Sequence, residues 1–232
     1  VLVAPEKFHK ADSWMFDPDL ALDSVALSYG DKNSMSVGVG HSVFKHNDTL
    51  DNAKDNVNVS NISGAFQMDG FSIGAAYNQF NHADDITLNS HAISNALKKA
   101  KIASLNVGYK NDKLSAGLFV GGNLDDHDGA KKETEAFGAS AKYDGGEWGA
   151  TVKYTALGEH STPSGLTDEF CDYRGYGTGI SCLQTGASYQ LGDIKIGADV
   201  YMKAALDDSV AKTSSGDDKT DVTAVVSAKV PF

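Results

Sequence analysis

The 232-residue sequence contains no apolar stretch long enough to form a membrane-spanning helix. Such a helix needs roughly 18 or more consecutive apolar residues, and the mean hydropathy of this chain is only -0.29. This absence excludes an α-helical membrane protein. It does not exclude a membrane β-barrel, because a transmembrane strand is apolar only at every second position.

Basic residues are too few for a nucleic-acid-binding protein. Lysine and arginine total 20 against 31 aspartates and glutamates, which gives a net charge of -11, whereas phosphate binding needs a basic face. Enzyme motifs are lacking as well: the sequence has no His-Glu-x-x-His, no Gly-x-Ser-x-Gly, no phosphate-binding glycine loop and no paired metal cysteines. His41 and Ser42 are neighbours, but they face opposite sides of a strand and cannot pair within it. We therefore predict no enzyme activity, cofactor, metal site or nucleic-acid partner.

Cysteine is rare, and the only two, Cys171 and Cys182, are close together in a Gly-rich polar segment. An even, local pair in an exposed loop predicts a disulfide formed in an oxidising compartment; the alternative is two reduced, buried thiols. A secretory leader is also lacking, because residues 1–5 have no basic region and are too short for an apolar leader core. We expect either a processed product or a chain that begins partway through a longer one.

What the sequence does contain is a period-two alternation of apolar and polar residues. Between Ile194 and Ala204, for example, every even position is apolar and the odd positions are small or polar, except for Tyr201. This period is typical of a strand with one apolar face. A helical turn is expected only near 92–101, inside a loop. The predicted strands are 22–30, 35–46, 58–68, 71–82, 102–110, 114–125, 137–143, 148–154, 181–191, 194–204 and 222–232.

The connections between these strands alternate in length. The short ones have hairpin residues and lie at 31–33, 69–70, 111–113, 144–146 and 192–193. The long ones are polar and acidic and lie at 47–57, 83–101, 126–131, 159–180 and 206–218. A β-sandwich gives no reason for this alternation, whereas an outer-membrane barrel has short periplasmic turns and long extracellular loops.

Aromatic residues of the apolar face gather beside the short turns. They are Tyr29, Phe66, Phe71, Tyr109, Tyr143, Trp148, Tyr189 and Phe232. Amphipathic rings favour a membrane–water interface, so we predict an aromatic girdle at this end of the barrel. A general preference of aromatics for strands does not explain why they gather at one end.

The sequence resembles the Gram-negative outer-membrane porin family over about residues 22–232. The similar features are the final Lys229-Val230-Pro231-Phe232, the hairpin at 66–77 and the segment 187–193. The resemblance implies an all-β, antiparallel transmembrane β-barrel in the outer membrane of a Gram-negative bacterium. It further implies a homotrimer, in contact with membrane lipid and lipopolysaccharide, and a C-terminal aromatic residue that directs barrel assembly.

Eleven predicted strands conflict with the even strand number of bacterial barrels, and two explanations remain open. In the first, residues 22–232 are part of a sixteen-stranded barrel that lacks its N-terminal strands here. Residues 1–21 are then a loop, similar to the end of the constriction loop that folds into the lumen of general porins. Its acidic residues are Glu6, Asp12, Asp17 and Asp19. In the second, residues 1–12 form an irregular first strand of a twelve-stranded barrel. We favour the first, because eleven strands follow that loop in the general porins.

The interior positions that this alternation predicts are small or polar, which favours a water-filled bore. The residues expected to line the pore are Lys110, Lys142, Lys153, Lys195, Asp199, Tyr201, Lys203 and Lys229. A basic wall of Lys153, Lys195 and Lys203 opposite the loop acids would set a transverse field and an ion preference; alternatively these lysines are merely solvated at the rims. We expect passive diffusion of ions and small hydrophilic solutes. The alternative is an anchor or adhesin with a filled lumen that binds through the 159–180 loop.

Overall fold

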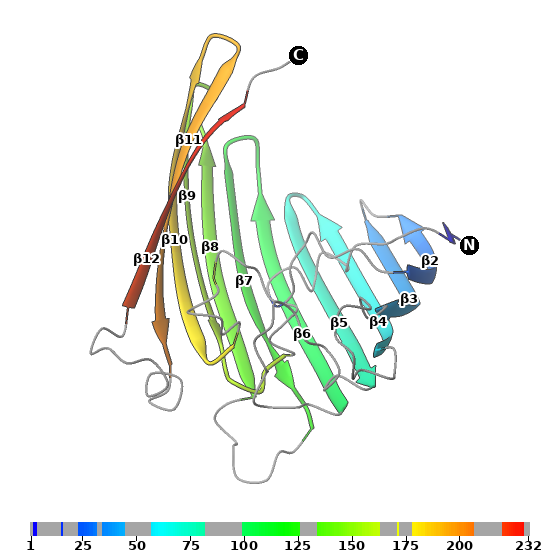
Figure 1. The fold of residues 1–232 in the computed structure, drawn as a ribbon. Coiled ribbons are helices and arrows are strands. Elements are labelled where there is room, and N and C mark those ends of the chain that lie inside the picture. The colour runs from blue at the N-terminus through cyan, green and yellow to red at the C-terminus, as the bar shows by residue number, and fades with distance from the viewer. Residues whose placement is uncertain are drawn as a thin grey trace.

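The computed structural model describes residues 2–3, 15, 23–31, 34–44, 57–81, 99–125, 134–162, 171, 178–206 and 220–229. They form one antiparallel sheet of twelve strands, each paired with its neighbours in the chain (Figure 1). The strands are β1 Leu2–Val3, β2 Asp23–Asp31, β3 Met35–Phe44, β4 Val57–Met68, β5 Phe71–Asn81, β6 Lys99–Lys110, β7 Leu114–Asn123, β8 Glu135–Asp144, β9 Trp148–Leu157, β10 Ile180–Leu191, β11 Ile194–Ala205 and β12 Thr220–Lys229.

The strand ends that are joined by short turns all lie at one end of the sheet, and the strand ends that lead into the long connections lie at the other (Figure 1). Local residue choice explains the tightest turns. Asp69 and Gly70 both have positive φ, 48° and 83°, as a two-residue type I′ hairpin requires. Gly192, with φ 58°, opens the turn between β10 and β11, where a type II′ hairpin needs glycine. The alternation predicted from the sequence is therefore confirmed.

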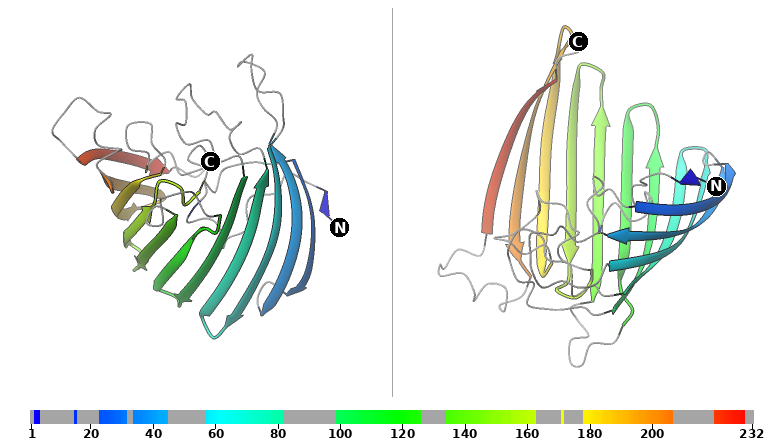
Figure 2. Two further views of the ribbon diagram at one scale, coloured as in Figure 1. Left: turned by 90° about the horizontal axis from the view of Figure 1, so that it is seen from below. Right: turned by 45° about the vertical axis from the view of Figure 1, so that its right-hand side comes forward.

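The sheet is strongly curved and has two distinct faces. Seen from the end with the long connections, the strands follow an arc that is open between β2 and β12 (Figure 2). We call the concave side the inner face and the convex side the outer face. The outer face has exposed apolar side chains along every strand from β2 to β12, such as Leu118, which is 63% exposed. In water such a face would be covered; in lipid it is stable.

The structure confirms the eleven predicted strands to within a few residues and corrects one detail. Residues 99–101, expected in a helical turn, extend β6 instead; the rest of that segment lies outside the described residues. Leu2–Val3 pairs with β2 as a short edge strand. Within the described part of the chain, no helix has the length and apolar character needed to cross a membrane.

Candidate functional site

The candidate site is the inner face of the sheet, where alternate residues of each strand point. Among the described strand positions of this face, six lysines stand against three aspartates. The lysines are Lys110, Lys142, Lys153, Lys195, Lys203 and Lys229; the aspartates are Asp144, Asp199 and Asp221. The wall is therefore basic although the whole chain has a net charge of -11.

A polar network lies on the inner face of β10 and β11. Gln184 Nε2 donates hydrogen bonds to Asp199 Oδ1 at 3.0 Å and to the Tyr201 hydroxyl at 3.2 Å. These three residues are brought together because Gln184 pairs with Tyr201 in the register, and Gly186 with Asp199. Asp199 is half-buried, and Tyr201 is only 8% exposed. The amide of Gln184, which the alternation along the sequence places at an interior position, thus binds both acceptors.

Charges alternate along the inner face of β11. Lys195, Asp199 and Lys203 follow one another at intervals of four residues, about 13 Å along an antiparallel strand. In the register with β12, Lys203 lies opposite Asp221, and Lys195 lies opposite Lys229. The end with the short turns therefore has two adjacent lysines, and the end with the long connections has a lysine beside an aspartate.

The expected pore-lining residues differ in their exposure to solvent. Lys110, Lys142, Lys195 and Lys229 are exposed and Lys153 is half-buried, whereas Lys203 is only 9% exposed. Lys110 lies on β6, four strands away from the polar network on β10. The expected constriction-loop acids Glu6, Asp12, Asp17 and Asp19, and the girdle residue Phe232, lie outside the described residues.

The sequence analysis missed an apolar patch on the inner face. Near the long-connection ends of β4 to β7, large apolar side chains are fully buried there: Val59, Phe80, Ile102 and Phe119. The prediction that inner positions are only small or polar is wrong for this part of the wall. The apolar run Leu118-Phe119-Val120 was the available sign, because in a strand such a run makes both faces apolar.

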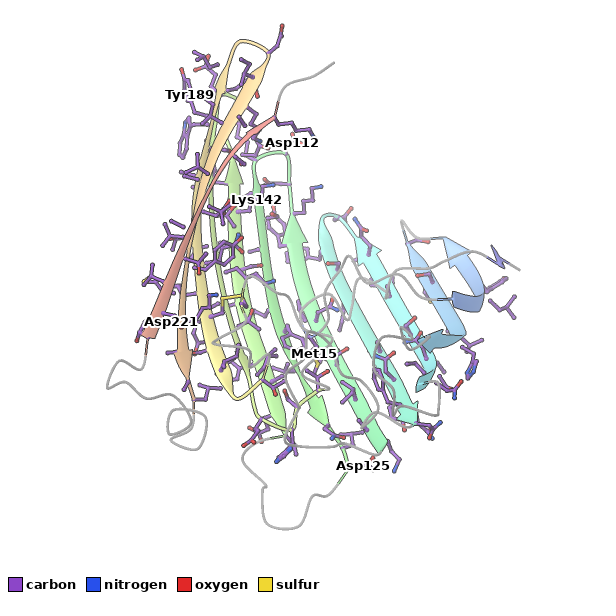
Figure 3. All side chains as sticks on the ribbon, viewed as in Figure 1. Met15, Asp112, Asp125, Lys142, Tyr189 and Asp221 are labelled. Atoms are coloured by element: carbon purple, nitrogen blue, oxygen red, sulfur yellow. A yellow bond between two sulfur atoms is a disulfide. The ribbon has the colours of Figure 1, made fainter. Side chains whose placement is uncertain are left out.

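Met15 lies against this patch and is 1% exposed. A methyl group placed on Gly121 would be 3.1 Å from the Met15 sulfur, and Gly121 belongs to the inner face of β7. Figure 3 shows Met15 in front of β6 and β7. The chain at residue 15 is therefore on the inner side of the sheet.

Cys171 and Cys182 form a disulfide, as the sequence predicted, with their Cα atoms 5.6 Å apart. The alternative of two reduced thiols is wrong. Cys182 lies on the inner face of β10 and is 3% exposed. The disulfide thus connects residue 171 to the inner wall.

The aromatic residues expected in a girdle lie beside the short turns of the outer face. Tyr29 is 83% exposed, and two cross-strand pairs are in ring contact, Phe71 with Tyr109 at 4.9 Å and Tyr143 with Trp148 at 4.6 Å between centroids. Phe71, Trp148 and Tyr189 are exposed, while Tyr109 and Tyr143 are half-buried by these contacts. The arrangement matches an interface with lipid headgroups.

A polar row crosses the outer face near the long connections. It runs in register through His41, Ser60, Gln79 and Lys101. His41 Nδ1 and Ser60 Oγ share a 3.2 Å hydrogen bond, and Lys101 forms a salt bridge of 2.6 Å with Asp125. From Lys101 to Tyr109 the strand covers about 27 Å, so the apolar band between row and girdle has roughly the height that a tilted membrane strand needs.

Among the described residues, no group of three or more His, Cys, Asp or Glu side chains is placed to hold a metal ion. The described features of the wall are its charges, its polar network, and Met15 and Cys171, which lie against it.

Comparisons with known proteins give the family. Residues 13–227 match the family described as Gram-negative porin. No curated protein sequence matches the chain. A solved structure of a triple mutant of the Rhodobacter blastica porin is similar in fold, with a TM-score of 0.48 and 18% sequence identity; the alignment covers 93% of this chain and 56% of that one. This chain thus spans little more than half the length of that porin. Because the family match extends over most of its sequence, the chain belongs to the Gram-negative porins and is a protein of the outer membrane.

Proposed function

We propose that this porin forms a water-filled channel through which ions and small hydrophilic solutes diffuse passively across the outer membrane. The main support is the opposite chemistry of the two faces. The outer face is apolar between the aromatic residues and the polar row, and the inner face, outside the apolar patch of β4 to β7, has lysines, aspartates and amides. A sheet with these faces encloses water when it closes in lipid.

The direct test is permeation by the protein purified from the outer membrane. In planar bilayers it should give discrete, ohmic conductance steps, and liposomes that contain it should swell in small sugars. A reconstituted protein that gives neither steps nor swelling is not a channel.

A second candidate, an anchor or adhesin with a filled lumen, has one observation in its favour. The buried side chains of Met15, Phe80 and Phe119 occupy space on the inner side of the sheet. Swelling separates the two functions, because an anchor admits no sugar. Against an adhesin that binds through residues 159–180, Cys171 of that segment is tied to the inner wall.

We further propose that Lys153, Lys195 and Lys203 give the channel an anion preference. Fixed positive charges on a pore wall raise the local concentration of anions. Replacing all three by glutamine should move the reversal potential in a potassium chloride gradient toward cation selectivity. Lys113→Gln, at an exposed position in a short turn, is the matched control. Unchanged selectivity in the triple variant would refute the assignment.

The constriction also remains a proposal. We propose that residues 1–21, apart from Leu2–Val3, which pairs with β2, fold into the lumen and present Glu6, Asp12, Asp17 and Asp19 to the basic wall. The burial of Met15 on the inner side of β7 supports this. Replacing the four acids by their amides should increase anion selectivity, opposite to the lysine variant. No shift would mean that these acids do not face the passage.

For partners, we propose a homotrimer surrounded by lipid and lipopolysaccharide. Support comes from the family match and from the polar row, whose Lys101 lies where headgroup phosphates would be. Native mass spectrometry from mild detergent should give three times the mass of one chain. A monomer under those conditions would refute the trimer.

A further inference from the structure

The connection between β9 and β10 meets the inner wall at a defined point. Cys182 points inward from β10, and in the register it lies between Thr155 of β9 and Lys203 of β11. The disulfide with Cys171 therefore fixes a residue of the connection directly beside one of the wall lysines.

The described ends of this connection are also packed. Ser161, Thr162 and Thr178 are buried, although they belong to a polar segment after the end of β9. Ser161 Oγ donates to the Gly158 carbonyl at 2.8 Å, and Thr178 Oγ1 donates to the Glu159 carbonyl at 2.9 Å. The two ends of the connection are thus joined to each other across 19 residues of sequence. A loop that projects into water would leave these hydroxyls exposed.

We propose that the Cys171–Cys182 disulfide holds Cys171 against the inner wall beside Lys203, and that residue 171 thereby narrows the passage and limits the size of the solutes that pass. This proposal rests on the proposed channel function. It adds Cys171 to the N-terminal segment as a second place at which the passage is narrowed. The burial of Lys203 beside Cys182 is consistent with this, because a covered lysine on a pore wall needs something lying over it.

Breaking the bond should release residue 171 from the inner wall. Reduction adds two electrons and two protons, supplied by a phosphine or dithiol reductant, and converts the disulfide into two thiols. Residue 171 is then no longer tied to the wall, so the passage widens and Lys203 becomes more exposed. A wider passage raises conductance, and a newly exposed lysine raises anion selectivity. General loosening of the barrel would increase conductance without this change in selectivity.

The experiment uses protein purified from the outer membrane and already inserted in a planar bilayer, so that folding is complete before the bond is broken. Addition of a phosphine reductant should raise the single-channel conductance, shift the reversal potential toward anions, and increase the largest sugar that enters liposomes. The double variant Cys171→Ser/Cys182→Ser should show these properties from the start and should not respond to the reductant.

A second measurement probes the location of the thiol. In the Cys171→Ser variant, a charged methanethiosulfonate added to the aqueous phase should react with Cys182 and lower the conductance. Heat-modifiable mobility on gels checks that each protein is folded.

Unchanged conductance, selectivity and sugar limit after complete reduction, or a fall in conductance, would overturn the proposal. These outcomes are distinct from failure of the channel function, in which no conductance appears before the reductant is added.

Discussion

The position of the Asp199 carboxylate depends on a glycine in the neighbouring strand. Gly186 and Asp199 face each other in the register of β10 and β11, and a methyl group added to Gly186 would overlap Asp199 Oδ1. Without a side chain at position 186, the carboxylate can lie across β10 and accept the hydrogen bond of Gln184. One missing side chain thus determines where this negative charge of the wall is located.

Replacing Asp199 by asparagine should make the channel more anion-selective. The change removes the negative charge between Lys195 and Lys203 but leaves an oxygen for Gln184 to bond. Two unit charges about 4–8 Å apart in water interact by about 0.5–1 kcal/mol, so the chloride-to-potassium permeability ratio should rise about two- to fivefold. The reversal potential in a salt gradient measures this ratio. Asp193→Asn, in the exposed turn, is the control; equal shifts in both variants would contradict a specific role of Asp199.

A residue-scale test of the N-terminal segment is available at Gly121. A methyl group there would be 2.7 Å from the Ala103 carbonyl oxygen and 3.1 Å from the Met15 sulfur. Gly121→Val should therefore displace Met15 from the wall at a cost of about 1–3 kcal/mol. We expect a lower unfolding temperature together with a changed conductance. Gly64→Ala, where a methyl group has only an ordinary contact with Ser36, should leave both unchanged; equal effects of the two variants would refute the assignment.

At the scale of the elements, the strands could be predicted because lipid and water impose a period of two on the side chains of each one. The hairpins could be predicted because few residue pairs adopt the positive φ of Asp69 and Gly70. The strand ends toward the long connections differ more, as in β9, which continues to Leu157. There the outer face leaves the apolar band, so the alternation no longer marks the strand.

The candidate site could be predicted only in part, for a related reason. Alternate residues of a strand lie on the same face of the sheet. This alternation places Lys195, Asp199 and Lys203 together on the inner face. It does not say which inner residues are covered, because coverage depends on segments distant in sequence. A methyl group on Gly121 would be 3.1 Å from both the Met15 sulfur and a ring carbon of Phe119, so these two side chains lie on the same part of the inner face. Lys203 lies beside the disulfide. Neither relation is visible in the local pattern.

A charged residue on the outer face should destabilise the protein in lipid. Leu118 is near the middle of β7 and is 63% exposed on that face, so Leu118→Arg should cost about 2–4 kcal/mol in lipid, the expected effect of a cation at the bilayer midplane. Urea-induced unfolding from lipid vesicles measures this loss. Ser140→Arg is the matched variant, because Ser140 lies on the inner face of β8. It should alter conductance with little effect on stability; equal destabilisation by both variants would mean that the faces are wrongly assigned.

At the scale of the whole molecule, the charge of the inner wall is opposite in sign to the net charge of the chain. The chain is acidic overall, but the described inner strand positions have twice as many lysines as aspartates. Most of the 31 aspartates and glutamates are therefore at sequence positions other than these inner strand positions. The net charge of the chain therefore does not give the sign of the wall, and the proposed anion preference depends on the wall.

The two edges of the open sheet indicate that the ring of strands is larger than the sheet seen here. Its edges, β1 and β12, do not pair with each other in the part of the chain that the structure describes. In lipid, each unpaired backbone group costs several kcal/mol. The described part of β1 has two residues, far fewer than the roughly 9–11 residues of a spanning strand. We therefore propose that further spanning strands close the ring between β2 and β12, toward the sixteen strands of a general porin.

Intact-mass measurement of the protein isolated from the outer membrane tests this closure. We expect a mass above the 24.5 kDa of this chain, by at least the mass of the several hairpins that the ring requires. The matched experiment refolds the 232-residue chain alone in lipid vesicles. With unpaired edges in the bilayer, it should give no stable conductance steps. A protein of 24.5 kDa that forms ohmic channels by itself would rule out the larger ring, because its β12 would then have to close directly on the N-terminal strands.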